Sequence, residues 1–534
     1  MQVRGRCLWG MLVLLLTVSV VFLTSDAVAQ TPPIWGDLEP GPYVAGFKTA
    51  EVYDYSRTFG RKFDYFGNPL PEQTTRRIQL CVWYPAQDTV GALPMVYGEY
   101  AYPYPEDDRF VNLLSALQTR EAYALIYLLN TNYVLALDMM SVEMAAVRDA
   151  QPAEGPFPLI IYHPHLRNSF AENAVMCEYL ATYGFVVATT HSVGTHELNS
   201  EVNLVDLETL TRDKEFVLAH VRAYPFVDAN RLGVMGYGWG GVTSLIMQMR
   251  NSDVMAVATF QGAFLWTDHL DLIRGIPQLA IERMYVPWLQ MYAPIEPPPD
   301  LALMDTCVYA PRYAARFSGL RREDFTIYGM ISEHREDSAN AYLEIASHGG
   351  EIICRYVKTF FRAYLNGDEE SRRFLDNSPA DNGIDPELLS LAFHASRRLP
   401  PTETQFVSII RDVGVAKAME IYEEFKASDP DHMIFRESVL NSLGYQLVRT
   451  QRTDEAQEVF RLNTEAYPHS ANTWDSYGEV CVANGDEATA LQCARKVLEV
   501  LAVDTTTSDQ VKEIIRNNAN QILERSQQQS PEGE

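Results

Sequence analysis

A short glycine-framed segment, GYGWGG, spans residues 236–241 of the 534-residue chain. It follows the apolar run 232–235 and precedes a helical pattern, so it predicts a sharp turn between a strand and a helix. Such a turn can expose a nucleophilic hydroxyl at its tip, but here the tip is Gly238, between Tyr237 and Trp239. Glycine has no side-chain oxygen, so acyl transfer through this position lacks its nucleophile.

Several histidines lie at the ends of predicted strands or in the loops beyond them. We expect them at one edge of the sheet, because the carboxyl ends of parallel strands meet there. They are His163, His165, His191 and His334. Three neutral imidazoles can hold zinc and activate water, which is an alternative route to hydrolysis. No carboxylate stands at ligand spacing, so no metal and no other cofactor is predicted.

The elements that must position these residues are short apolar runs separated by helical patterns. Strands are predicted over 78–84, 159–162, 185–189, 232–235, 254–260, 288–292 and 325–330, and helices over 172–183, 207–221 and 241–249. This alternation predicts an α/β fold with a mostly parallel sheet covered by helices on both faces. The stretch 95–155 interrupts the rhythm, and we interpret it as an insertion over the upper edge of the sheet, with a lid as one role it could serve.

The N-terminal segment has the layout of a secretory signal peptide. Arg4 and Arg6 precede an apolar run, and Ala27-Val28-Ala29 offers a cleavage site before Gln30. We therefore expect removal of residues 1–29, a secreted or periplasmic mature chain and no stable membrane insertion afterwards; an uncleaved anchor is the alternative. Six cysteines remain without a CxxC pair, so a disulfide is permitted but not implied.

The charge balance excludes one class of partner. The formal net charge is −27, spread along the chain without an acidic block. Because phosphate binding needs a basic face, nucleic acid is not an expected partner. The acidic balance itself is explained by a solvated surface that keeps the protein in solution.

From about residue 400 the pattern changes to helices alone and repeats with a period of 34 residues. Leu440, Leu443, Gly444, Leu447, Ala456, Phe460 and Pro468 match Trp474, Tyr477, Gly478, Cys481, Ala490, Ala494 and Ala502. Small residues at Gly444 and Ala456 would let two antiparallel helices approach closely. Residues 400–525 resemble tetratricopeptide (TPR) repeats, except that Asn463 stands where a small residue is usual; a plain helical hairpin is the alternative. The resemblance implies a protein or peptide partner on a concave face.

The sheet region, predicted as a domain over 30–385, also resembles a known family. The segments RRIQLCVWYPA, PLIIYHPH, YLATYGFVVATTHSVGT, GYGWGGVTSL and YVKTFFRAYL are similar to α/β-hydrolases of the dienelactone hydrolase and platelet-activating-factor acetylhydrolase branch. In that family the glycine-framed turn is the nucleophile elbow. The resemblance places Tyr237 before the nucleophile, Gly238 in its place and Trp239 after it, and it implies a small acyl or lipid-like ligand in the crevice.

The resemblance also shows what else has changed. His334 would be the remnant general base, although a surface histidine is the alternative. The acid should follow the strand 288–292, but the first carboxylates there are Glu296 and Asp300, in a proline-rich loop, and neither is assigned as the acid. Relatives carry glycines after the strand that ends at His163, where they shape an oxyanion hole, but this chain has Pro164 and His165.

These changes favour a catalytically dead binding or scaffolding protein whose crevice involves Tyr237, Trp239, His163, His165 and His191. The alternative is an active carboxylic ester hydrolase with an unorthodox nucleophile or a metal-activated water. The repeats could also be only a stabilising cap on the first domain.

Overall fold

The computed structural model describes residues 31–64, 66–70, 74–88, 91–101, 138–331, 341–430, 433–504 and 508–529. The chain divides into two compact units, 1–396 and 397–534, which are described separately. The predicted signal peptide, residues 1–29, lies outside the described residues. So does His334.

A single mixed sheet organises the described part of the first unit. Its strands are ordered β10-β9-β8-β7-β6-β4-β5-β2-β1-β3. They span Val44–Phe59 (β1), Thr74–Ala86 (β2), Val147–Arg148 (β3), Phe157–His163 (β4), Val186–Thr189 (β5), Val227–Tyr237 (β6), Val254–Phe260 (β7), Trp288–Tyr292 (β8), Arg312–Phe317 (β9) and Leu389–His394 (β10). The strands from β5 through β4, β6, β7 and β8 to β9 run parallel, and β2 and β10 pair antiparallel at either end of that block.

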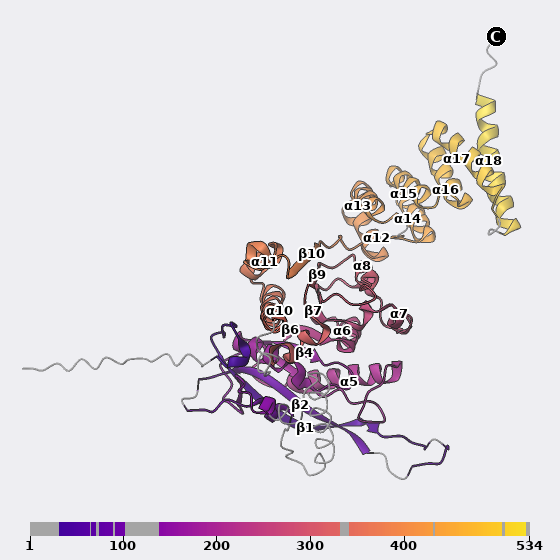
Figure 1. The fold of residues 1–534 in the computed structure, drawn as a ribbon. Helices are drawn as coiled ribbons and strands as arrows, with labels where there is room; N and C mark the ends of the chain where they lie inside the picture. Colours follow the sequence, from indigo (N-terminus) through magenta and orange to yellow (C-terminus); the bar gives the residue numbers. More distant parts are fainter. Residues whose placement is uncertain are drawn as a thin grey trace, which may run out of the picture. The chain divides into compact units, whose positions relative to one another are not determined.

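Helices cover both faces of this sheet, and alternate residues of each strand feed two separate cores. Ile160 of β4 belongs to the core beneath α4 (Ala174–Thr182) and α10 (Ala341–Leu365). Its neighbours Leu159 and Ile161 belong to the core beneath α5 (Leu204–Val221) and α6 (Trp239–Arg250). Figure 1 shows α10 on one side of the strands and α5 and α6 on the other. The predicted α/β class with an α/β-hydrolase-type sheet is confirmed.

Shorter elements complete the first unit. They are η1 (Pro33–Trp35), α1 (Tyr97–Ala101), η3 (Phe170–Asn173), η4 (Ala263–Leu265), α7 (Thr267–Arg274), η5 (Ile281–Arg283), α8 (Ala302–Asp305), η6 (Arg322–Phe325), α9 (Ile327–Ile331), α11 (Glu369–Asp376) and η8 (Ala380–Asn382).

The strand predicted over 325–330 is wrong. These residues form the end of η6 and most of α9, and the last parallel strand of the sheet is instead β9, Arg312–Phe317. Phe325, Ile327 and Met330 are buried on the core side of the short helices. A short apolar run satisfies either a strand or a buried helix, and periodicity alone does not separate the two. Because the last parallel strand ends at Phe317, the connection at its carboxyl end begins at Ser318 and includes Arg322, not the residues that follow Met330.

A buried carboxylate fastens the described part of the insertion to the core. Glu178 of α4 is fully buried and accepts hydrogen bonds from the Tyr100 hydroxyl at 2.5 Å and from the amides of Ala145 and Ala146 at 3.0 Å. The Trp35 indole approaches it at 3.4 Å. Burial raises the pKa of Glu178 to about 7, although all four of these donors favour its ionised form.

A second buried ionic group joins β2 to α5. Asp213, whose side chain is 1% exposed, accepts hydrogen bonds from Arg76 at 2.5 and 2.8 Å, and Arg57 pairs with it at 2.8 Å. The remaining donors of Arg76 go to the carbonyls of Val193 and Gly194. Because these charges lie in the interior, their pairing is required for stability.

The second unit consists of consecutive helices. They are α12 (Glu403–Asp412), α13 (Val415–Ser428), α14 (Glu437–Arg449), α15 (Thr453–Ala466), α16 (Ala471–Asn484), α17 (Glu487–Leu501) and α18 (Asp509–Gln529). Helices α12, α14 and α16 begin 34 residues apart, at 403, 437 and 471, as do α15 and α17, at 453 and 487.

Small residues let the paired helices of this unit approach closely. A Cβ on Gly444 would lie 2.5 Å from Cζ of Phe460, whereas one on Gly478 would lie 3.2 Å from Cβ of Cys493. The atypical Asn463 is fully buried and donates from Nδ2 to the Glu437 carbonyl at 3.2 Å. A polar residue is therefore accommodated where the repeat pattern expects a small one.

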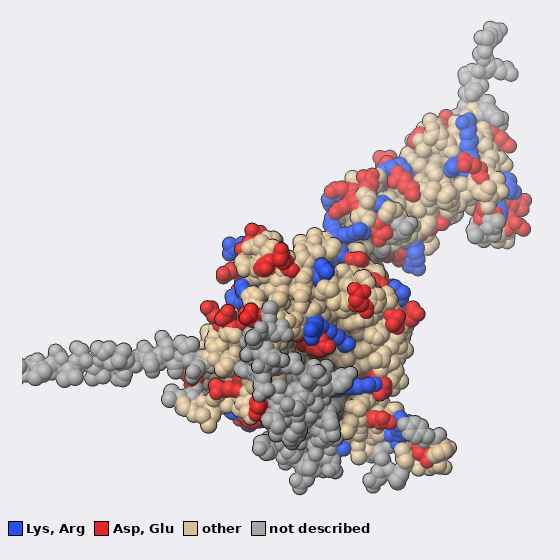
Figure 2. Space-filling view, viewed as in Figure 1, with Lys and Arg blue, Asp and Glu red and all other residues tan. Residues whose placement is uncertain are grey.

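The remaining global features are surface charge and cysteines. Figure 2 shows acidic and basic side chains interspersed over the visible face of both units. All six cysteines within the described ranges are buried and free: Cys81, Cys177, Cys307, Cys354, Cys481 and Cys493. No helix in the described part of the chain is long and apolar enough to cross a membrane.

Candidate functional site

The predicted sharp turn joins β6 to α6, and Gly238 stands at its tip. Gly238 has φ 57° and ψ −119°, a conformation that a residue with a side chain adopts only under strain. Its N–H donates to the Phe260 carbonyl of β7 at 2.9 Å, and its carbonyl accepts from the Ala263 amide at 3.0 Å. The backbone thus retains the shape of a nucleophile elbow.

The glycine at the tip is also required by space. An ideal Cβ built on Gly238 would overlap Cδ2 of His165 and would lie 2.9 Å from its Nε2. The imidazole of His165 therefore occupies the space above the elbow into which a nucleophilic side chain would project. Sequence reasoning predicted the missing oxygen but not the side chain that fills its place.

His165 is held in this position from three sides. Its backbone N–H donates to Oε1 of the buried Glu172 at 2.8 Å, and its ring Nδ1 lies 2.8 Å from the Leu166 carbonyl. Nε2 is hydrogen-bonded to a guanidinium nitrogen of Arg322. Burial and the Arg322 charge lower the pKa of His165 to about 3, so the ring is neutral. Nδ1 consequently donates to Leu166, and Nε2 accepts from Arg322.

Arg322 lies at the start of η6, in the connection that follows β9. Its guanidinium lies 5.1 Å from the ring centre of Trp266 and 5.9 Å from that of Tyr237. The Tyr237 hydroxyl donates to the Arg322 carbonyl at 3.1 Å. In α/β-hydrolases the triad histidine is the last of the three in chain order. Among the described residues, an arginine from the connection after the last parallel strand approaches the elbow tip through its contact with His165.

Of the other predicted site histidines, His163 and His191 lie within the described ranges and are not brought together as a ligand set. His163 is 1% exposed and its Nδ1 lies 2.9 Å from the Thr243 hydroxyl, while burial holds its pKa well below the usual value. Nε2 of His191 lies 3.1 Å from Oε1 of Gln79, and its ring packs against Phe170. Within the described ranges, no three His, Cys, Asp or Glu residues are placed to hold a metal ion.

The first two carboxylates after β8, Glu296 and Asp300, lie in the loop that follows this strand. Glu296 is exposed there, and Asp300 caps the short α8 by accepting from the Ala302 amide at 2.7 Å. In the part of the chain that the structure describes, neither carboxylate is hydrogen-bonded to a histidine. Trp239, predicted to line the crevice, is 3% exposed and packs on the ring of His269 at 4.8 Å.

The oxyanion hole is also altered. Of the two residues that follow β4, Pro164 has no N–H, and the N–H of His165 already donates to Glu172. Glu172 in turn accepts from the Tyr162 hydroxyl at 2.7 Å and from Asn168 Nδ2 at 2.6 Å. This carboxylate fixes the loop in a form that directs its amide away from a reacting oxygen, so transition-state charge would find no donor from this loop.

One further residue beside the elbow is unusual. Gln261 directly follows Phe260 and is fully buried, with a left-handed φ of 46°. Neither its side-chain nitrogen nor its side-chain oxygen has a hydrogen-bond partner among the described residues. Strained backbone and unsatisfied buried amides are concentrated at functional sites, and the sequence gave no signal of either.

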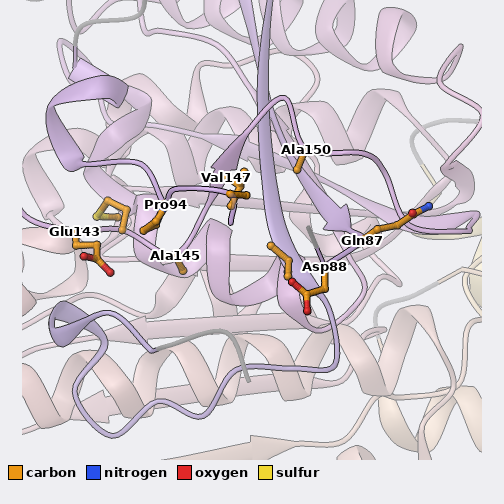
Figure 3. A pocket seen from close by; sticks show the side chains of 10 residues that line it. Gln87, Asp88, Pro94, Glu143, Ala145, Val147 and Ala150 are labelled. Atoms are coloured by element: carbon orange, nitrogen blue, oxygen red, sulfur yellow. The ribbon is translucent and has the colours of Figure 1, made fainter. Parts of the chain in front are cut away.

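Two of the cavities in the described part of the sheet unit bear on the choice of site. The smaller, about 140 Å³, adjoins the elbow and is lined by His165, Asn168, Tyr237, Arg322, Glu323, Thr326 and Tyr328. A larger one, about 370 Å³, lies beside β3 and includes Gln87, Asp88, Pro94, Glu143, Ala145, Val147 and Ala150 (Figure 3). The elbow residues do not line the larger cavity, so the smaller one is the candidate site.

The sheet order and the β6–Gly238–α6 elbow define an α/β-hydrolase-type unit. No family model matches the sequence, and no curated protein matches it. Among solved structures, a ferulic acid esterase from Streptomyces cinnamoneus is similar over 66% of this chain and 97% of that chain, at 19% identity and a TM-score of 0.44.

Proposed function

We propose that this protein is a non-catalytic α/β-hydrolase-fold binding protein. The observation that carries the proposal is the occupied elbow: Gly238 has no nucleophilic atom, and the His165 ring fills the space above it. Loss of the serine from a triad costs about 10⁶ in kcat, which is roughly 8 kcal/mol of transition-state stabilisation.

The residues around the tip cannot replace the lost machinery. A general base must accept a proton, but Arg322 is permanently cationic and His165 already accepts from it through Nε2. The pKa of His165, about 3, makes it a poor base near neutral pH. The altered loop after β4 removes an oxyanion donor as well. Among the described residues, the elbow therefore has no nucleophile, no free general base at its tip and one oxyanion donor fewer.

The competing proposal is an active ester hydrolase with an unorthodox nucleophile. One hydroxyl near the elbow favours it: Thr243 Oγ1 lies 2.9 Å from His163 Nδ1. However, Thr243 and His163 are 2% and 1% exposed, and the threonine hydroxyl also donates to the Gly240 carbonyl at 3.1 Å. An ester could reach this pair only after the α6 end of the elbow had moved, so we favour the non-catalytic reading.

The second unit supports a scaffolding role. Helices α12, α14 and α16, and likewise α15 and α17, begin 34 residues apart, and Gly444 lets α14 approach Phe460 of α15 closely. We propose that it is a TPR-like module for a protein or peptide partner, in an exported protein whose first unit derives from the dienelactone hydrolase and acetylhydrolase branch.

A serine-directed fluorophosphonate probe, combined with hydrolysis assays on short acyl esters, tests the proposal. The purified protein should remain unlabelled and should not turn over the esters, while an ordinary serine esterase in the same assay should be labelled. Turnover that survives purification and disappears in Thr243→Val would establish the competing proposal. Turnover abolished by a chelator would instead indicate metal-activated water.

A further inference from the structure

The guanidinium of Arg322 lacks a counterion in the described part of the chain. No carboxylate there forms an ion pair with it, and its hydrogen-bond acceptor is the neutral ring of His165. Its Nε is buried and has no partner. The group is flanked by the rings of Trp266 and Tyr237. A partly buried cation with unused donors is costly unless an anion completes it.

The cavity beside Arg322 has the size and lining for the head of a small anion. Its volume of about 140 Å³ is below the roughly 300–1,000 Å³ of pockets that enclose whole drug-sized ligands, so it would take a head group only. Asn168, Thr326 and the aromatic rings of Tyr237 and Tyr328 form part of its wall. Polar groups beside Arg322 could orient an oxygen pair, and the rings could cover a short carbon stem.

The charges around the cavity limit what kind of anion fits. Glu323 is in the wall, and the nearby Glu172 is already committed to His165, Tyr162 and Asn168. Arg167 forms a bond with Glu201 and does not supply a second free cation. One guanidinium therefore faces the cavity in a protein of net charge −27. This balance favours a monoanion over a phosphate dianion.

From this arrangement we infer that the elbow cavity binds the carboxylate of a small organic acid, held by the guanidinium of Arg322. A planar guanidinium matches a carboxylate because two parallel N–H···O bonds can form. The inference rests on the proposed function, since it treats the former catalytic crevice as a binding site. It assigns that site an acid rather than an ester.

The test is a ¹⁹F NMR titration of the full-length protein with 4-fluorobenzoate, with 4-fluorobenzamide as the uncharged analogue. We expect saturable binding of the benzoate and none of the benzamide. Arg322→Gln should weaken benzoate binding at least about tenfold, because a charge-assisted hydrogen bond is lost. Arg321→Gln is the matched control: its guanidinium lies on the Tyr342 ring at 4.1 Å, and its loss should leave binding unchanged. Equal effects of the two variants would overturn the inference.

Measurements on the wild-type protein keep the inference testable if Arg322→Gln does not fold. Acetate should displace 4-fluorobenzoate, and inorganic phosphate should not; displacement by phosphate at equal concentration would refute a carboxylate site. Affinity should be flat between pH 5 and 8, because arginine stays charged and His165 stays neutral over that range. Among the described residues, the other charged or titratable groups nearby are Arg167, Glu172, Tyr237, His269, Glu323 and Tyr328. Tightening below pH 7 would assign binding to a histidine and overturn the role of Arg322.

The two proposals fail in distinguishable ways. Labelling by the fluorophosphonate probe would refute the non-catalytic function, whatever the titration shows. Absence of benzoate binding by an unlabelled protein would refute only the inference about Arg322.

Discussion

Substituting serine for Gly238 tests both the strain at the elbow and the crowding above it. At φ 57° a side chain costs about 1–3 kcal/mol of backbone strain. The new Cβ would overlap the His165 ring, which must then rotate and release its hydrogen bond from Arg322, at a cost of about 1.5–3 kcal/mol for a charge-assisted bond. We expect Gly238→Ser to destabilise the first unit by about 3–5 kcal/mol, and we expect no labelling by the fluorophosphonate probe.

Thermal or urea unfolding measures this loss, and two companion variants divide it into its causes. Gly238→Ala adds the same Cβ without a hydroxyl and should be destabilised to a similar extent. In the background of His165→Ala, the serine should cost less, because the overlap is gone while the strain remains; a double-mutant cycle gives the difference. Rapid probe labelling of Gly238→Ser at unchanged stability would refute the reasoning, and so would a neutral Gly238→Ala.

Three further predictions concern stability. Asp213→Ala should destabilise the protein by about 3–5 kcal/mol in a urea titration, because it leaves Arg76 and Arg57 without their buried partner. Glu197→Ala is the control: it removes an exposed ion pair with Arg61 and should cost under about 1 kcal/mol in the same titration. For Glu178, the folded pKa of about 7 lies above the ordinary glutamate value of 4.5, so the contribution of this group to stability falls as pH rises from 4.5 through 7. Wild type should therefore lose stability relative to Glu178→Gln between pH 5 and 8, and a constant difference would contradict the assignment. Gly444→Ala should destabilise the helical unit by about 1–3 kcal/mol through contact with Phe460, while Gly478→Ala should be close to neutral; calorimetry of the full chain should show only one transition shifting, and equal effects would refute the packing argument.

The strands of the central sheet could be predicted from the sequence because they are buried on both faces. Runs such as 159–162 and 254–260 are almost wholly apolar and lie within β4 and β7. The sequence was insufficient for β1, whose residues 44–59 are mostly half-buried and carry no continuous apolar signal. The run 325–330 was misassigned for the opposite reason, since a short buried helix is as apolar as a strand.

In the candidate site, features set by neighbouring residues in the chain could be predicted, and features set by distant residues could not. Gly238 and its sharp turn could be predicted because neighbouring residues in the chain determine the turn. The position of the His165 ring could not, because it depends on Glu172, Leu166 and Arg322 acting together. Arg322 itself has one local signal: the alternating RYAARF segment before it is β9, and recognising that strand would have placed the following loop at the elbow.

The filled elbow tip also limits how such a chain can change over generations. Some glycine codons become serine codons by one nucleotide change, so the missing hydroxyl can be a single mutation away. That step would place the new side chain where His165 already lies, and the variant would be selected against for poor folding before any hydrolysis could be selected for. A lineage would have to clear His165 and replace Arg322 first, and neither change alone would bring catalysis. The packing of His165 above Gly238 therefore makes a return to ester hydrolysis less accessible by mutation than continued use of the crevice for binding.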